Sequence, residues 1–230
     1  MIITIASNMQ GVGKTLIATN IATLRLLAGH RVKLVDLAPN QRSAKWCAAR
    51  NASDIAPSIP AVALKGKQLK DEFDEIAVGC NDVIIDTDWR NSAGNLAALE
   101  TSDQVVVPVL LNERSVEDLK PMIRRIKTAR RVNPRLRALV VIARAPDKLS
   151  LFHLEAVRRY IAKVPFAALQ GTIIHEHDVL QTASSAHLSI FEFKPADARA
   201  VAEMRDLYRA QKRRRTVQPS LSRLLRDART

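Results

Sequence analysis

Cysteines, aromatic residues and long apolar runs are all scarce in this chain of 230 residues. Its two cysteines, Cys47 and Cys80, exclude a disulfide framework and lack the spacing of metal ligands. No stretch approaches the roughly 18 to 20 uninterrupted apolar residues that a membrane-spanning helix needs. The first ten residues, MIITIASNMQ, lack the basic and long apolar regions of a signal peptide. These absences predict a soluble cytoplasmic protein.

Basic residues are what the chain has in excess: 36 Lys and Arg stand against 23 Asp and Glu, for a net charge of +13. Residues 1–111 hold 11 basic and 11 acidic side chains, whereas residues 112–230 hold 25 basic and 12 acidic ones. The entire excess therefore lies in the second half. Such asymmetry indicates a polyanionic partner of that half, either nucleic acid or an anionic membrane surface.

Short apolar, β-branched segments alternate with helical segments along the chain. We expect strands at 2–6, 32–36, 59–64, 83–86, 104–109, 136–143 and 172–174. We expect helices at 14–28, 43–50, 67–78, 95–100, 115–132, 150–163, 178–185 and 196–215. This alternation predicts an α/β fold with a mainly parallel, twisted sheet and helices on both faces. One domain would span residues 1–215, and a basic tail would follow at 216–230.

A phosphate-binding loop is predicted between the first strand and the first helix. Glycines let backbone N–H groups wrap phosphates, a lysine reaches the β- and γ-phosphates, and a Ser or Thr hydroxyl meets Mg²⁺. Gly13, Lys14 and Thr15 stand where this chemistry needs them. The first glycine of the usual G-x-x-x-x-G-K-S/T pattern is replaced by Asn8, so the context carries the prediction.

From residue 9 onward the chain resembles the ParA/MinD family of P-loop ATPases. That family has a deviant loop of the form K-G-G-x-G-K-S/T, with which M-Q-G-V-G-K-T at residues 9–15 aligns. Residues 33–46 resemble its second strand and switch I, and 83–87 resemble its I-D-T-P-P strand and switch II. Residues 105–109 resemble its strand ending in I-P-V, and 173–193 resemble a segment near its end.

The resemblance implies a P-loop NTPase fold, ATP and Mg²⁺ as cofactors, and a homodimer. It implies catalytic roles for Lys14, Asp36 and Asp86, and a Mg²⁺ site formed by Thr15, Asp36 and Asp86. The nucleotide would be bound by Gln10, Gly11, Val12, Gly13, Lys14, Thr15 and Leu16, with Arg144 at the base edge. A ParB-like or adaptor protein would be a further partner.

Two departures from the family pattern concern hydrolysis. The family's signature lysine, which reaches the phosphates of the dimer partner, falls at Met9, and a thioether cannot neutralise phosphate charge. The carboxylate that positions the attacking water falls at Ala38. Asp88 would be a substitute for this carboxylate, and Arg42 or Arg90 for the lysine. The alternative is that these three are solvated loop charges, so binding is better supported than hydrolysis.

Two cationic clusters in the second half are candidate DNA contacts. The helix at 115–132 keeps an apolar face and carries Arg124, Arg125, Arg130 and Arg131 opposite it. The final helix ends in Lys212, Arg213, Arg214 and Arg215. With few aromatics to stack on bases, the clusters predict binding to phosphates without sequence preference, and hence association with the nucleoid.

The predicted function is a ParA-like ATPase that binds DNA and positions a plasmid, a chromosome locus or a protein assembly. Alternatives are a nucleotide-gated or nucleotide-insensitive DNA-binding protein with little ATPase activity, and a MinD-like ATPase that binds membranes through its tail. A membrane partner is not expected, because only Leu221, Leu224 and Leu225 make the tail apolar. His175 and His177 alternate at the end of an expected strand, so they are expected to point apart and not to share a metal ion.

Overall fold

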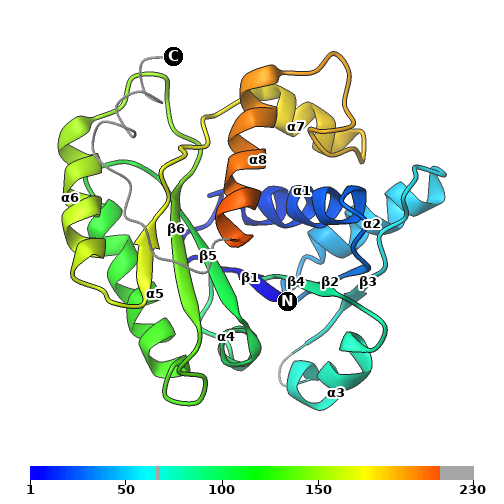
Figure 1. Ribbon diagram of the computed structural model, residues 1–230, viewed down its shortest axis with the longest axis horizontal. Helices are drawn as coiled ribbons and strands as arrows, with labels where there is room; N and C mark the ends of the chain where they lie inside the picture. Colours follow the sequence, from blue (N-terminus) through cyan, green and yellow to red (C-terminus); the bar gives the residue numbers. More distant parts are fainter. Residues whose placement is uncertain (66–67, 213–230) are drawn as a thin grey trace.

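The computed structural model describes residues 1–65 and 68–212, and in this part of the chain seven parallel strands form one sheet in the order β3-β2-β4-β1-β5-β6-β7 (Figure 1). The strands are β1 (Ile2–Ile5), β2 (Val32–Asp36), β3 (Ala61–Ala63), β4 (Asp82–Asp86), β5 (Gln104–Val109), β6 (Arg137–Ile142) and β7 (Ala167–Leu169). The helices are α1 (Lys14–Leu27), α2 (Arg42–Ala52), α3 (Gln68–Ala77), α4 (Ala93–Thr101), α5 (Ser115–Ala129), α6 (Leu151–Ala162), α7 (Asp178–Ser185) and α8 (Ala198–Lys212).

Alternate residues of the central strands face two opposite layers of helices. In β5, Val106 packs in the apolar core shared with α1, α2, α7 and α8, whereas Val105 and Val107 pack with α5 and α6. In β4, Ile84 belongs to the first of these layers, and Ile85 packs with α3 and α4. Both layers are visible in Figure 1, where α8 lies beside α1. The predicted α/β fold, with a parallel sheet covered on both faces, is confirmed.

The order of the strands brings the ends of β1, β2 and β4 together. From β1 the chain builds β2, β3 and β4 on one side of the sheet and then crosses to β5 on the other. The register pairs Ile5 with Asp86 and Asp36 with Asp86, so both carboxylates lie at the carboxyl edge next to the loop that leaves β1. Open α/β sheets bind ligands at this edge, where the strand order reverses.

The last strand lies earlier in the chain than the β-branched pattern predicts. Ala167–Leu169 forms β7 against β6, whereas residues 172–174 form no strand. An isolated bridge from Ala145 to His175 is the only sheet-like pairing that follows in the described part. Pairing with β6 therefore outweighs the β propensity of Thr172, Ile173 and Ile174. No helix of the described ranges is long and apolar enough to cross a bilayer.

Candidate nucleotide-binding site

The loop between β1 and α1 has the conformation that a phosphate-binding loop requires. Gly11 and Gly13 have φ angles of 72° and 85°, in the left-handed region that side chains with a Cβ rarely adopt. Gly13 is the residue that precedes α1, and its carbonyl accepts the first helical bond from Ile17 N at 2.9 Å. The N–H groups of the first helical turn remain without intrahelical partners, which suits an anion.

Lys14 closes this loop with its own side chain. Its Nζ donates a hydrogen bond of 2.6 Å to the carbonyl oxygen of Met9. The side chain is largely buried, and this burial lowers the pKa of Lys14 although the charges of Asp86 and Asp88 oppose the shift. The ammonium group thus lies across the loop in which phosphates would be held.

Thr15 and Asp86 form the part of the site that fits a magnesium ion. Thr15 Oγ1 donates to Asp86 Oδ2 at 2.7 Å, and Asp86 is fully buried. The second carboxylate oxygen, Oδ1, has no hydrogen-bond partner among the described residues. A buried carboxylate oxygen without a partner, beside a threonine hydroxyl, fits the oxygen ligands that Mg²⁺ prefers. Burial, together with the nearby charge of Asp36, raises the pKa of Asp86 to about 7.

Asp36 lies beside Asp86 but is held by the start of α2. Its Oδ1 accepts from Ala38 N at 2.8 Å, and its Oδ2 accepts from Ser43 Oγ at 2.7 Å and Ala44 N at 3.0 Å. Both oxygens are therefore bonded within the protein. Asp36 fixes the position of α2 and contributes negative charge next to Asp86, and its direct contact with Mg²⁺ stays a prediction.

The segment after β4 holds two predicted substitutes for the missing catalytic residues, Asp88 and Arg90, and bonds them to each other. Asp88 accepts hydrogen bonds from Arg90 Nε and Asn95 Nδ2, both at 2.6 Å. Burial opposes ionisation of Asp88, but these bonds and the charge of Arg90 outweigh it and lower its pKa. Trp89 is 47% exposed and does not belong to the core. Asp88 and Arg90 are thus paired with each other, which leaves Arg42 as the freer cation.

Positions 9 and 38, where the chain departs from the family pattern, carry apolar side chains. Met9 is half-buried and packs against the apolar core to which α5 contributes, and Ala38 is half-buried and bonded through its N–H to Asp36. Arg42 begins α2, is exposed, and lies close enough to Lys14 to lower its pKa further. A cation therefore approaches the loop from α2, not from position 9.

Arg144 contacts the phosphate loop directly. It follows β6 with a φ of 51°, donates from a terminal nitrogen to the carbonyl of Gly11 at 2.6 Å, and forms an ion pair with Glu176. The side chain thus contacts the backbone of the glycine loop, and its contact with the base edge stays a prediction. Glu176 was missed by sequence reasoning, because its role depends on a contact 32 residues away.

Of the four predicted DNA contacts on and after α5, two are exposed and two are bonded to other groups of the described chain. Arg124 and Arg131 are exposed on and after α5. Arg125 donates to the carbonyl of Arg90 at 3.1 Å, and Arg130 donates to the carbonyl of Leu136 and covers the ring of Phe166. Lys212 ends α8, and Arg213, Arg214 and Arg215 lie outside the described residues, as does the tail at 216–230.

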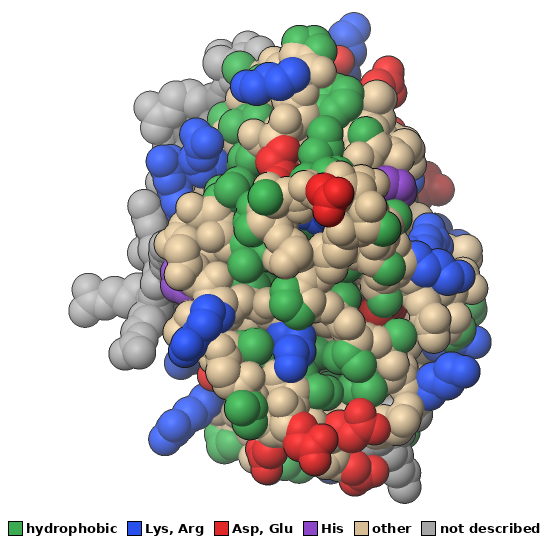
Figure 2. All heavy atoms as spheres, turned by 90° about the vertical axis from the view of Figure 1, so that its right-hand side faces the viewer, with side chains coloured by type: hydrophobic (Ala, Val, Ile, Leu, Met, Phe, Trp, Pro, Cys, Tyr) green, Lys and Arg blue, Asp and Glu red, His purple; other side chains and the backbone are tan. Residues whose placement is uncertain are grey.

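Several acidic side chains of the first half of the chain gather on one helix. Helix α3 carries Asp71, Glu72, Asp74 and Glu75. Figure 2 shows acidic side chains gathered at the lower end of the face where α3 lies. Because these carboxylates repel phosphates, this end does not suit a polyanionic partner.

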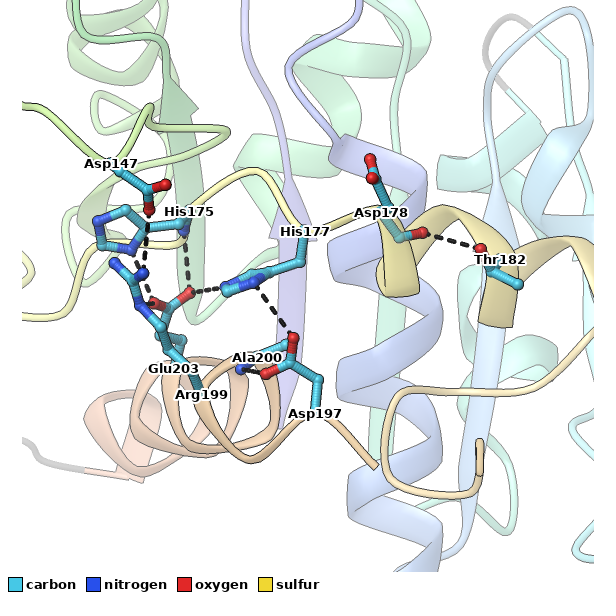
Figure 3. A network of polar contacts seen from close by, with 9 residues as sticks. All are labelled: Asp147, His175, His177, Asp178, Thr182, Asp197, Arg199, Ala200 and Glu203. Atoms are coloured by element: carbon cyan, nitrogen blue, oxygen red, sulfur yellow. Dashed lines mark hydrogen bonds and ion pairs between the residues drawn. The ribbon is translucent and has the colours of Figure 1, made fainter. Parts of the chain in front are cut away.

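The expectation that His175 and His177 point apart is wrong. Because residues 172–177 are not a regular strand, both rings turn toward Glu203 of α8 (Figure 3). The Nδ1 of His175 lies 2.7 Å from one oxygen of Glu203, and the Nε2 of His177 lies 2.9 Å from the other. Period-2 alternation applies only to extended strands.

Residues 3–190 match the model of the CobQ/CobB/MinD/ParA nucleotide binding domain. The fold is similar to that of a plasmid partition protein from Borrelia burgdorferi B31 bound to AMPPNP, with a TM-score of 0.71, 17% identity, and coverage of 92% of this chain and 99% of that one. It is also similar to the ATP complex of a Cyanothece McdA variant, with a TM-score of 0.69, 15% identity, and coverage of 94% and 98%.

A cell division protein, MinD of Aquifex aeolicus, has a TM-score of 0.62 and 15% identity, with coverage of 95% of this chain and 99% of that one. No curated protein sequence matches significantly. Identities this low show the fold alone, but the family match spans most of the chain, from β1 to the residues after α7. The chain therefore belongs to the CobQ/CobB/MinD/ParA family of nucleotide-binding domains.

Proposed function

We propose that this chain is a ParA-like ATPase that binds ATP with Mg²⁺ and binds DNA without sequence preference, and so partitions or positions a cargo. The cargo would be a plasmid, a chromosome locus or a protein assembly. The observation that carries the proposal is the pair of Thr15 and Asp86, together with Asp86 Oδ1, which has no hydrogen-bond partner in the part of the chain that the structure describes. A buried carboxylate oxygen that lacks a hydrogen bond gains a partner when a cation binds beside it.

Each residue of the site would have a distinct task. The N–H groups at the start of α1 and the Lys14 ammonium would bind the phosphates. Thr15 and Asp86 would hold Mg²⁺, which when bound neutralises charge on the phosphates. To do so, Asp86 must lose its proton, and Thr15 Oγ1 must turn an oxygen lone pair toward the ion. Asp36, held by Ser43, would keep the surroundings negative.

Hydrolysis would be slow or would depend on a partner. Position 9 supplies no cation and position 38 no carboxylate, and Asp88 is bonded to Arg90 and Asn95. Preorganised charge at the γ-phosphate is the main source of rate in phosphoryl transfer, and an arginine finger contributes roughly 10³- to 10⁵-fold. These same observations favour a second candidate, a nucleotide-gated DNA-binding protein with little ATPase activity.

The proposed DNA surface consists of the exposed cations of the second half, with Arg124 and Arg131 in the described part. A homodimer would present two such surfaces, and a ParB-like or adaptor protein would trigger release. The protein would then be located on the nucleoid.

The test is a DNA-retention assay without nucleotide, with ADP and with ATP, performed in parallel with measurement of ATP affinity. Lys14→Ala should weaken ATP binding by about 10- to 100-fold, because hydrogen bonds to charged groups contribute about 1.5–3 kcal/mol. Lys45→Ala, which removes an exposed lysine of α2, is the matched control and should change little. Undiminished ATP affinity in Lys14→Ala refutes the site.

The Met9→Lys variant separates the two candidates. Under the ATPase proposal, the added cation should raise ATP turnover in the presence of DNA and partner. If DNA retention responds to ATP but neither protein hydrolyses it, the nucleotide-gated alternative holds. If nucleotide changes retention in neither protein, both candidates fail.

A further inference from the structure

Three ligand-type side chains converge on one point between α8 and the segment that follows β7. They are His175, His177 and Glu203, and the potential ligand atom of each lies within 4.8 Å of the other two. His175 Nδ1 lies 2.7 Å from Glu203 Oε1, and His177 Nε2 lies 2.9 Å from Glu203 Oε2. Figure 3 shows the carboxylate between the two rings.

The backbone makes this convergence possible. Glu176 N donates to the carbonyl of Ala145 at 2.9 Å, and the Glu176 side chain pairs with Arg144 on the side of the phosphate loop. His175 N donates to Glu203 Oε2 at 2.9 Å. The segment is therefore anchored at His175 and at Glu176, which lies between the two histidines. Their side chains are 2% and 10% exposed, and that of Glu203 is 9% exposed.

Two imidazoles and one carboxylate are a ligand set for a borderline divalent ion. Zn²⁺ takes two His and one Glu in some sites, at roughly 2.0–2.2 Å from each ligand atom. In a tetrahedron of that size the ligand atoms lie roughly 3.4 Å apart, so small side-chain shifts of about 1 Å bring the present set into place. Hard ions such as Mg²⁺ prefer oxygen ligands and would not select two histidines.

A second carboxylate orients one of the rings from behind. His177 Nδ1, on the side of the ring away from Glu203, lies 3.5 Å from Asp197 Oδ2. Asp197 itself is fixed at the start of α8, where its Oδ1 accepts from Ala200 N at 2.9 Å. Metal-bound histidines almost always donate their other ring N–H to such a group, which sets the tautomer and raises the basicity of the ligand.

One cation competes for the same carboxylate. Arg199 Nε donates to Glu203 Oε1 at 3.1 Å, and its terminal nitrogen donates to Asp147 at 3.0 Å. Arg199 is 37% exposed, so it can leave Glu203 and keep its contact with Asp147. A metal ion would take the place of the proton at the ligating nitrogen of each imidazole. It would also displace the Arg199 guanidinium from Glu203, and the rest of the packing would stay.

We propose that His175, His177 and Glu203 form a Zn²⁺ site that fastens helix α8 to the segment after β7. The site shares no residue with the magnesium site at Thr15 and Asp86, and it goes beyond the proposed function. Because Glu176 lies between the two histidines and pairs with Arg144 at the phosphate loop, the ion would also fix that contact.

The experiment is a titration of the metal-free, full-length protein with Zn²⁺ against a chromophoric chelator. We expect one Zn²⁺ per chain. His177→Ala should abolish stoichiometric binding, and Asp197→Asn should weaken it by about 10- to 100-fold, the usual effect of losing an outer-shell partner. Arg199→Gln should strengthen binding, because it removes the competing cation. His153→Ala, on α6, and Cys80→Ser are the controls and should leave the affinity unchanged.

A thermal melt provides a second readout. Zn²⁺ should raise the Tm of the wild type and of His153→Ala, but not of His177→Ala. If His177→Ala does not fold, Asp197→Asn and Arg199→Gln still test the proposal. Both residues lie nearer the surface, and the two variants should shift the Zn²⁺ affinity in opposite directions. The proposal is overturned if the wild type binds no stoichiometric Zn²⁺, or if its affinity equals that of His177→Ala. An ATP affinity that is unchanged throughout would leave the proposed function untouched.

Discussion

Replacing Asp86 by Asn should stabilise the metal-free protein at alkaline pH, although it removes a residue of the proposed magnesium site. Burial and the neighbouring Asp36 raise the pKa of Asp86 from its ordinary 3.8 to about 7. Each pKa unit corresponds to about 1.36 kcal/mol, so the ionised carboxylate opposes folding by about 4 kcal/mol above pH 7. Asn keeps the bond from Thr15 Oγ1 through its amide oxygen and carries no charge.

The pH dependence follows from the direction of the shift. Between pH 3.8 and 7 the folded protein binds a proton at Asp86 that the unfolded chain has lost, so wild-type stability falls as the pH rises through this window. The advantage of Asp86→Asn should therefore be about 4 kcal/mol at pH 8 and about 1 kcal/mol near pH 4.5. Urea unfolding in EDTA at several pH values measures it.

Asp88→Asn is the matched control, because the pKa of Asp88 is shifted the other way. That variant should lose stability at neutral pH, and the loss should fade toward acid. With MgATP the wild type should become more stable than Asp86→Asn, since a bound ligand stabilises only the form that binds it. If Asp86→Asn is less stable than the wild type at pH 8 in EDTA, or if the difference does not change with pH, the account of this buried carboxylate is wrong.

Three further variants test other parts of the molecule. Glu192→Ala should cost about 3–5 kcal/mol in urea unfolding, because it leaves the fully buried Arg50 guanidinium without its ion pair. Glu155→Ala, which breaks two ion pairs on the surface of α6, should cost far less than Glu192→Ala, and an equal loss in both would contradict the role of burial. Replacing Arg124 and Arg131 together by Ser should reduce the slope of log affinity for DNA against log salt by about 1.8, and an unchanged slope would remove them from the DNA surface.

Local sequence was sufficient for the phosphate loop because its signals lie within one short segment. The glycines at 11 and 13 are demanded by left-handed φ angles, and Lys14 and Thr15 begin the helix that those glycines permit. The central strands were equally predictable, since runs of β-branched residues buried on both faces leave few alternatives. β7 was misplaced because its Ala-Ala-Leu sequence has little β propensity, and pairing with β6 alone makes it a strand.

The sequence by itself determined the fold class, the phosphate loop and the unequal distribution of charge, because spacing along the chain encodes all three. Only the tertiary structure decided that Ser43 holds Asp36, that Arg144 reaches Gly11, and that Glu203 joins two histidines. The last two contacts link residues 133 and 28 positions apart, and side chains so distant in sequence meet only where packed strands and helices bring them. The same packing shifts the pKa values of Asp86 and Asp88 in opposite directions, through burial and through hydrogen bonds. Neither burial nor hydrogen bonding of a side chain can be read from the order of residues.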